Sequence, residues 1–283
     1  MFDFLGWGIF VSNQIGTGYQ ISEVALRVLV VRRIIKIFAN FLKIACYGFH
    51  WVFPKKRFTL PAYSAPLASL LKNQLIPATI WQTNFTNRVT LPVYLNYLFN
   101  RIMAPRYEYR FMITSDRENF VEMEYPGAIF ESFKRLQIGA SQADFWRVLV
   151  LQRFGGVYLD IDAHFIWPAQ KLIKPNNREL FLQIKTGEIS NYFIASKPDN
   201  PHLAHVIRQI TANITSNSSA NVYDLTGPGA FNHCLGSMNV QKVYYLRACN
   251  QGNFTNEHFQ YIDKPQGKWT KEQQTTALVS KND

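Results

Sequence analysis

One stretch, residues 141–164, constrains the fold of this chain more than any other, and its sequence is SQADFWRVLVLQRFGGVYLDIDAH. The spacing of Ser141 and Asp144 is typical of a capping box, so it predicts that a helix begins at Ser141. Gly155 suits the left-handed residue that ends a helix. From Val157 the apolar residues recur with a period of two, which is typical of a strand. The stretch therefore predicts a helix, a glycine turn and a strand in succession.

Two aspartates, Asp160 and Asp162, lie on the same side of the predicted strand. Alternate residues of a strand are roughly 6.5 to 7 Å apart, so both carboxylates can flank one hard cation and its bridging waters. Two acids at the end of an apolar strand are costly to desolvate unless a cation compensates, and Mg²⁺ or Mn²⁺ with substrate phosphates would do so. A second interpretation stays open, in which both acids are simply solvated at a strand end.

The whole stretch resembles the sugar-binding DXD region of glycosyltransferase family 32 and of the related large clostridial glucosylating toxins. Their pattern is A-S-D-x-x-R followed by G-G-x-Y-x-D-x-D, and this chain has glutamine at Gln142 where serine is usual. The matching positions are Ala143, Asp144, Arg147, Gly155, Gly156, Tyr158, Asp160 and Asp162. The resemblance implies a GT-A type nucleotide-sugar-binding domain of the α/β class, with a mixed, mostly parallel sheet.

The resemblance also implies roles for these side chains. Asp144 and Arg147 would contact the ribose and the sugar of the donor, Tyr158 would belong to the same donor site, and Asp160 and Asp162 would hold a metal ion and the diphosphate. The i, i+3 spacing of Asp144 and Arg147 independently puts both on one face of the predicted helix. The alternative for this pair is a surface ion pair of little energetic weight.

Weaker likenesses to the family extend from Ile76 to Trp269. Trp81, at the end of the family's opening strand, is the candidate for stacking on the donor base, although a core tryptophan would look the same. Asn191 is a candidate contact for the donor sugar or the acceptor, and a turn asparagine is its alternative. Thr226 begins a T-G-P segment that resembles the floor of the family's active site.

The family pattern changes near the C-terminus. Lys268 stands before Trp269 where the family has a metal-binding serine, and both residues are assigned to the donor site. The third metal ligand is therefore expected from Asp263 or Gln266. Lys268 would instead offset the charge of the diphosphate directly.

Other apolar segments agree with an α/β domain, because strand, helix and strand in that order call for a parallel crossover. The predicted strands are 76–83, 107–114, 179–184 and 192–195, and the predicted helices are 91–103 and 201–211. Residues 213–221 are predicted to form a polar loop.

The N-terminal residues 1–57 differ in composition from the rest. The net charge of the chain is +11, and residues 1–60 contain eight basic and two acidic side chains. The remainder has no basic run, which argues against nucleic acid as a partner. Apolar residues recur at spacings of three and four, with a basic set opposite them. The apolar set is Ile21, Val24, Val28, Val31, Ile35, Phe38, Leu42, Cys46 and Phe49, and the opposite set includes Arg32, Arg33, Lys36 and Lys43.

This pattern predicts an amphipathic helix that lies on an anionic membrane surface and does not cross it. A helix that packs on the protein or on a partner is the alternative. We therefore divide the chain into a membrane-associating segment at residues 1–57, a linker at 58–74 and the GT-A domain at 75–283. Three unpaired cysteines favour a reducing compartment, hence the cytoplasmic face of a membrane, with the Golgi lumen as the alternative.

The sequence favours a metal-dependent glycosyltransferase, and the resemblance implies that it is a retaining one. The resemblance implies a nucleotide-sugar donor, a UDP-sugar rather than a GDP-sugar, and a glycan or lipid-linked acceptor in surface polysaccharide or lipooligosaccharide synthesis. A haloacid-dehalogenase-like phosphatase or phosphotransferase is the second hypothesis, with Asp160 attacking phosphorus and Asp162 protonating the leaving group. His164 stands against it, because threonine or valine is usual there. A catalytically inert membrane-surface scaffold is the third hypothesis.

Overall fold

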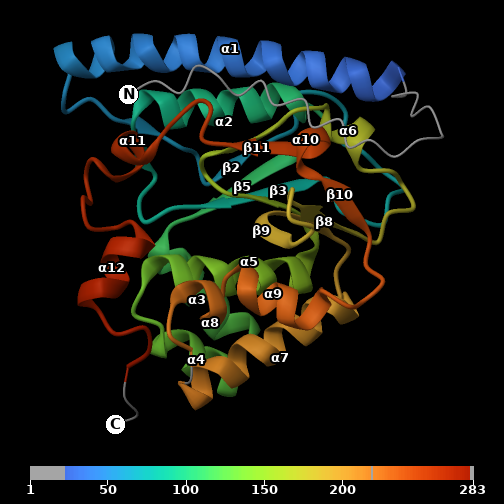
Figure 1. Cartoon of the computed structure of the whole chain (residues 1–283), viewed down its shortest axis with the longest axis vertical. Coiled ribbons are helices and arrows are strands. Elements are labelled where there is room, and N and C mark those ends of the chain that lie inside the picture. Colours follow the sequence, from blue (N-terminus) through green and yellow to red (C-terminus); the bar gives the residue numbers. More distant parts are fainter. Residues whose placement is uncertain (1–22, 218, 281–283) are drawn as a thin grey trace, which may run out of the picture.

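The structure is a computed structural model that describes residues 23–217 and 219–280. A central sheet has helices on both faces (Figure 1). The helices α1 (Glu23–Val52) and α2 (Leu91–Met103) lie on one face, and α5 (Gly139–Phe154) and α7 (Pro201–Ser216) lie on the other. The predictions made for residues 1–22, among them Ile21, lie outside the described residues.

The central sheet has seven strands in the order β10-β8-β9-β6-β3-β5-β2. Their bounds are β2 (Tyr63–Ser64), β3 (Thr79–Thr83), β5 (Glu108–Met112), β6 (Gly156–Leu159), β8 (Glu179–Gln183), β9 (Ile189–Ser196) and β10 (Lys242–Tyr244). β10 pairs parallel with β8, and β3 pairs parallel with both β5 and β6. β9 is antiparallel to both of its neighbours, and β2 is antiparallel to β5. Five strands thus point the same way, which confirms the predicted mixed, mostly parallel sheet.

Smaller elements complete the described part of the chain. The remaining strands are β1 (Phe58–Thr59) with β4 (Arg88–Val89), and β7 (Ala163–Phe165) with β11 (Cys249–Gln251). The remaining helices are α3 (Thr114–Glu124), α4 (Ala128–Arg135), α6 (Ala169–Leu172), α8 (Val222–Leu225), α9 (Pro228–Leu235), α10 (Tyr245–Ala248), α11 (Glu257–Tyr261) and α12 (Trp269–Thr275). The helix predicted at 91–103 matches α2, whereas α7 extends to Ser216, through the first part of the predicted polar loop.

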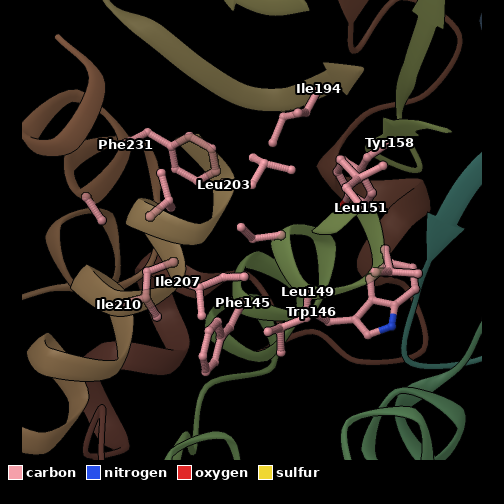
Figure 2. Close-up of a cluster of buried hydrophobic side chains, with 14 of the residues drawn as sticks. Phe145, Trp146, Leu149, Leu151, Tyr158, Ile194, Leu203, Ile207, Ile210 and Phe231 are labelled. Atoms are coloured by element: carbon pink, nitrogen blue, oxygen red, sulfur yellow. The ribbon is translucent and has the colours of Figure 1, made fainter. Parts of the chain in front are cut away.

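Helix α5 is the centre of the larger apolar core (Figure 2). Phe145, Trp146 and Leu149 are fully buried, and they pack with side chains of α7, α9 and β9. The helix begins at Gly139 and no side chain caps it, so the predicted start at Ser141 is wrong. Because α5 begins five residues before Asp144, this carboxylate does not cap the helix and is free for another role.

The turn after α5 needs its two glycines. Gly155 and Gly156 have φ angles of 64° and 107°, which side chains rarely tolerate. A Cβ atom at Gly156 would also lie 2.7 Å from the carbonyl oxygen of Thr79, on the neighbouring strand β3. The turn therefore lets β6 enter the sheet directly beside β3.

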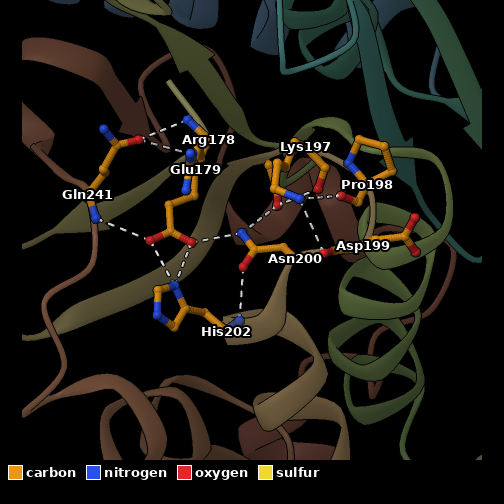
Figure 3. Close-up of polar contacts among 9 residues, drawn as sticks. Arg178, Glu179, Lys197, Pro198, Asp199, Asn200, His202 and Gln241 are labelled. Atoms are coloured by element: carbon orange, nitrogen blue, oxygen red, sulfur yellow. Dashed lines mark hydrogen bonds and ion pairs between the residues drawn. The ribbon is translucent and has the colours of Figure 1, made fainter. Parts of the chain in front are cut away.

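A buried carboxylate joins three elements at the other end of the sheet (Figure 3). Glu179 of β8 accepts hydrogen bonds from Nδ2 of Asn200 at 2.7 Å and from the backbone N–H of Gln241 at 3.3 Å, and Nδ1 of His202 lies 2.8 Å from its Oε2 atom. Asn200 in turn caps α7 by accepting from the backbone of His202. This cluster fixes the start of α7 and the segment before β10 to β8.

The inner face of α1 packs on the domain, against α2 and α10. Val28, Ile35 and Cys46 are buried there, and Nζ of Lys43 donates to the carbonyl oxygen of Gly252 at 3.0 Å. The sequence predicts that this apolar face lies on a membrane with Lys43 on the opposite side. That assignment of faces is wrong, because periodicity locates an apolar face without telling what covers it.

The outer face of α1 is also apolar. Ile37, Phe41 and Ile44 are 70%, 71% and 69% exposed, and Trp51 in the last turn is 85% exposed. Further exposed apolar side chains of this helix are Leu26, Val30, Ile34, Phe38 and Val52. Arg33, one turn before Ile37, is exposed beside them. We call this the outer face of α1. Within the described residues, no helix is both long and apolar enough to span a membrane.

The segment 58–74 is more than a connecting stretch. Phe58 and Thr59 pair with β4, and Tyr63 and Ser64 add β2 to the edge of the central sheet. The sequence predicts a linker here, because its prolines interrupt regular structure, but short edge strands tolerate neighbouring prolines. This segment therefore fixes α1 to the domain by backbone pairing.

Candidate active site

A cavity of about 580 Å³ opens at the carboxyl ends of three parallel strands. Thr83 ends β3, Thr114 follows β5 and Asp160 follows β6, and all three residues line the cavity. Ligands of open α/β sheets bind at this edge. The cavity brings together six predicted site residues from the central motif and the following strand, which are Asp144, Arg147, Tyr158, Asp160, Asp162 and Asn191.

The two motif aspartates share one hydrogen-bond donor. Nε2 of Gln251 lies 3.1 Å from Oδ2 of Asp160 and 2.9 Å from Oδ1 of Asp162. The other oxygen of Asp160 accepts from the hydroxyl group of Tyr158 at 2.7 Å and pairs with Arg147 at 3.2 Å. One oxygen of Asp160 is therefore held by the protein, while the second faces Asp162 across the amide group.

This arrangement fits a divalent cation. Burial, and secondly the charge of Asp160, raise the pKa of Asp162 to about 6, so a positive charge between the two carboxylates would be stabilising. The Gln251 amide occupies the position between two hard oxygen ligands that a cation would take. Within the described residues, no cluster of three or more His, Cys, Asp or Glu side chains could hold a metal. The remaining ligands would have to come from water, amide oxygens or a bound phosphate.

Asp263, a predicted third metal ligand, does not join this site. Its two carboxylate oxygens accept from Nε and Nη2 of Arg57, each at 2.6 Å, and it borders a separate small pocket. Arg57 holds the pKa of Asp263 below its usual range, mainly through this hydrogen bond. Gln266, the other candidate, does not line the cavity. The expectation for Asp263 is wrong because the sequence gives no sign that residue 57 packs against residue 263.

Arg147 is the hub of the buried charges. Its Nη2 atom lies 2.8 Å from Oδ1 of Asp144 and 3.2 Å from Asp160, while Nη1 donates to the carbonyl oxygen of Asn191 at 2.8 Å. The guanidinium group also lies 4.4 Å from the ring centroid of Tyr158. The Asp144–Arg147 ion pair is therefore part of a buried network at the cavity wall. It is not the solvated surface ion pair that the sequence left open as an alternative.

Asp144 is held by polar side chains from two other elements. Its Oδ1 atom accepts from Nδ2 of Asn191 at 3.0 Å, and its Oδ2 atom accepts from the hydroxyl group of Thr226 at 3.3 Å. Burial raises the pKa of Asp144 to about 6, and the charge of Arg147 opposes this shift. Asn191 and Thr226, each predicted from a weak likeness, thus contact the strongest part of the motif.

Trp81 does not line the cavity, so its predicted stacking on a donor base is wrong. The side chain is buried in the core, donates from Nε1 to the carbonyl oxygen of Gly155 at 2.9 Å, and stacks on Phe154 at 5.9 Å between ring centroids. The alternation of β3 turns it toward α5. The aromatic side chain that lines the cavity from this part of the chain is Phe85, which follows the strand and which sequence reasoning missed.

The C-terminal part of the chain closes the cavity. Lys268 and Trp269 line it, as does Lys264. Lys268 pairs with Glu257 at 2.7 Å, and Lys264 pairs with Glu272 at 2.9 Å. Sequence reasoning also missed four residues that line the cavity and carry no motif, which are Arg117 of α3, Gln251 at the end of β11, and Gln260 and Tyr261 at the end of α11.

Comparison with known proteins agrees with this location. Residues 92–179 match the family described as glycosyltransferase sugar-binding region containing DXD motif, which spans from α2 to the start of β8. The chain is 28% identical over 139 residues to mannosyl phosphorylinositol ceramide synthase CSH1 of Saccharomyces cerevisiae. That match covers 48% of this chain and 36% of the yeast protein, so the chain spans about a third of its relative's length.

Two solved structures are similar at low identity. The PaToxG glycosyltransferase has a TM-score of 0.43 and 16% identity, over 74% of this chain and 78% of the other. The UDP-bound glycosyltransferase domain from the YGT toxin has a TM-score of 0.29 and 14% identity, over 45% of this chain and 41% of the other.

Proposed function

We propose, from the premise that residues 92–179 are the sugar-binding region of a DXD-containing glycosyltransferase, that this chain moves a sugar from a nucleotide-sugar donor to an acceptor with the help of a divalent metal ion. The observation that carries the proposal is the geometry of Asp160 and Asp162. Both carboxylates line the same cavity, and one oxygen of each faces the same amide group.

Some residues of the cavity would hold the metal ion, and others would bind the donor. Asp160 and Asp162 would hold Mn²⁺ or Mg²⁺, which when bound offsets the negative charge of the departing nucleoside diphosphate. Arg147 keeps Asp160 in place by an ion pair, and Tyr158 does so by a hydrogen bond. Asp144 is held by Asn191 and Arg147, which fixes its carboxylate at the cavity wall, where it would accept hydrogen bonds from hydroxyl groups of the donor.

The finer points of the reaction are part of the proposal. The resemblance to the clostridial toxins supports retention of the anomeric configuration and a UDP-sugar donor. The name of the yeast relative contains a mannosyl group and a ceramide, which supports a lipid-linked acceptor. A role in surface polysaccharide or lipooligosaccharide synthesis agrees with such an acceptor.

We also propose that the chain binds an anionic membrane from its cytoplasmic face through the outer face of α1. This face carries large apolar side chains in a row along the helix, with exposed Arg33 and Lys36 at its edge and Lys55 and Lys56 after its end. A helix of this kind lies in the interface, where apolar burial supplies most of the affinity and basic side chains add to it. The inner face remains in contact with the domain, so the whole enzyme would be held close to its acceptor.

The test of the proposed function is a screen of nucleotide sugars for hydrolysis in the presence of Mn²⁺. We expect at least one nucleotide sugar to be hydrolysed, EDTA to stop the reaction, and Asp160→Asn to abolish it. Asp199→Asn removes the same charge from an exposed residue outside the cavity and should behave like the parent protein. Hydrolysis that persists in Asp160→Asn with EDTA present would rule out the metal site.

A further inference from the structure

Arg117 is a buried cation at the cavity wall. The residue lies near the start of α3 and is only 3% exposed. Its Nη1 atom donates to the hydroxyl group of Thr83 at 3.0 Å, and its Nη2 atom donates to the hydroxyl group of Thr114 at 3.1 Å. Its Nε atom is buried and has no hydrogen-bond partner among the described residues.

The charges that line the cavity are paired with two exceptions. The eight charged side chains are Arg117, Asp144, Arg147, Asp160, Asp162, Lys264, Lys268 and Glu272. Arg147 pairs with Asp144 and Asp160, Lys264 pairs with Glu272, and Lys268 pairs with Glu257. Within the part of the chain that the structure describes, Arg117 and Asp162 take part in no ion pair. The cavity therefore holds one negative and one positive group that are complementary to a cation together with an anion.

Arg117 is attached to the strand that neighbours the aspartate motif. Thr83, which accepts its hydrogen bond, ends β3, and β3 pairs with β6 on one side and β5 on the other. The neighbouring Gln82 donates from Nε2 to the carbonyl oxygen of Asp160 at 3.0 Å. Thr83, the residue that holds the guanidinium group, thus lies on the strand next to the one that leads into the motif, and neighbouring strands are roughly 5 Å apart.

We infer that Arg117 binds a phosphate oxygen of the nucleoside diphosphate in the donor, on the side of the diphosphate that faces β3 and β5. This inference rests on the proposed function, because it names a further residue for the same site. A nucleobase carbonyl would also accept a hydrogen bond, but only an anion offsets a buried charge that has no carboxylate partner. The planar guanidinium group suits phosphate oxygens in particular.

Burying the Arg117 cation costs desolvation energy, which is consistent with a ligand-binding residue. Burial lowers the pKa of Arg117 to about 10, and the nearby charge of Arg147 contributes in the same direction. The cation still carries its charge at neutral pH, without compensation from the described carboxylates. A side chain kept for stability alone would be paired, whereas a side chain kept for binding is compensated when the ligand arrives.

The experiment compares the affinity of Arg117→Met for UDP and for uridine, with Mn²⁺ present and by competition calorimetry. We expect UDP to bind the variant about 10- to 100-fold more weakly, the range for a charge-assisted hydrogen bond, and uridine to bind within about twofold of the parent. Arg117→Lys, which keeps the charge, should recover part of the loss. Arg153→Met removes a surface arginine outside the cavity and controls for net charge.

Thermal unfolding without ligand separates binding from support of the fold. Because Arg117 is not paired, Arg117→Met should unfold at the same temperature as the parent or higher. Unchanged UDP affinity, an equal loss for uridine and UDP, or a lower unfolding temperature would each overturn the inference. If the parent protein binds neither UDP nor GDP with Mn²⁺, the proposed function fails, and the inference about Arg117 fails with it.

Discussion

The side-chain amide of Gln251 lies 2.9 Å from Asp162, and the same nitrogen reaches Asp160 at 3.1 Å. A neutral donor therefore stands between two carboxylates, of which Asp162 has its pKa raised to about 6 by burial and by Asp160. This relationship makes the site selective for a cation, because a divalent ion removes a repulsion that the amide only reduces.

Asp162→Asn should remove metal binding without harming the fold. We expect the affinity for Mn²⁺ to fall by at least about 100-fold, since one of two carboxylate ligands is lost. In the absence of metal the variant should be at least as stable as the parent, because the repulsion between the two acids is gone. Paramagnetic titration with Mn²⁺ and thermal unfolding in EDTA measure the two effects. A variant that keeps the parent's Mn²⁺ affinity would place the metal elsewhere.

Arg147 should tolerate lysine better than alanine. Arg147→Ala leaves the buried Asp144 and the half-buried Asp160 without their cation, so a loss of about 3 to 5 kcal/mol in the free energy of unfolding is expected. Arg147→Lys keeps the charge but loses the planar fork, so it should fold and lose turnover by about 10- to 100-fold. Urea unfolding and the rate of donor hydrolysis check both results. Equal turnover in Arg147→Lys and the parent would mean that the fork has no part in the reaction.

Phe85 and Trp81 should respond oppositely to substitution. Trp81→Leu should destabilise the fold by a few kcal/mol, because the side chain fills the core beside Phe154, and donor affinity should be unchanged. Phe85→Leu should weaken nucleotide binding several-fold and leave stability almost unchanged, because Phe85 borders the cavity. Chemical unfolding and calorimetry with UDP distinguish the two. Loss of UDP affinity in Trp81→Leu alone would restore the original prediction.

The outer face of α1 should determine membrane binding. The triple change of Ile37, Phe41 and Ile44 to Gln replaces three large, exposed apolar side chains by polar ones, so binding to vesicles with anionic phospholipid should fall by at least about tenfold. Met123→Gln, on α3 across the sheet, is an exposed apolar control (Figure 1). Vesicle sedimentation at low and high salt measures the effect. If the triple variant instead changes a dimer into a monomer and vesicle binding is absent, a second copy covers this face.

Acid should loosen the end of α1 through His50. Its Nε2 atom accepts a hydrogen bond from the backbone N–H of Leu91 at 3.1 Å, which requires the neutral ring. Burial, and secondly the charge of Arg57, lower the pKa of His50, with His258 and Asp263 also close to the ring. The folded protein thus binds fewer protons here than the unfolded chain. The neutral His50 ring therefore stabilises the fold at pH values above about 6.5, the pKa of histidine in the unfolded chain, and this stabilisation is lost as the pH falls.

Hydrogen exchange checks this prediction. Amides at the end of α1 and the start of α2 should exchange faster at pH 5.5 than at pH 7.5, after correction for the intrinsic rate. His50→Gln can accept from the same amide without titrating, so its corrected exchange should not depend on pH. A parent protein that shows no such pH dependence would exclude the role of His50.

The sequence was sufficient where information is local. The motif helix, the glycine turn and the aspartates all lie within 24 consecutive residues, and the structure brings Asp144, Arg147 and Asp160 together as their spacing indicates. The mixed sheet likewise follows from the order of strands and helices along the chain.

The errors arise where distant segments meet. Trp81 and Phe85 are four residues apart, and only the geometry of β3 decides which one reaches the cavity. Asp263 forms an ion pair with Arg57, and the inner face of α1 packs on the domain. Neither contact can be predicted from the periodicity of the local sequence. Arg117 belongs to the same group, because a single arginine in a helix has no pattern to recognise.

The antiparallel strand β9 has a consequence for the order in which the molecule folds. β6, β8 and β9 come from one continuous segment, whereas β3 joins β6 from much earlier in the chain. Pairings between close segments cost less loop-closure entropy, so we expect this three-stranded unit, with β9 between β8 and β6, to form in the folding transition state and β3, β5 and β2 to be added later. Substitutions that weaken the β8–β9 pairing should therefore slow refolding, while those in β2 should mainly accelerate unfolding. The strand that ends in the aspartates would acquire its place before the half of the cavity that carries Arg117 exists.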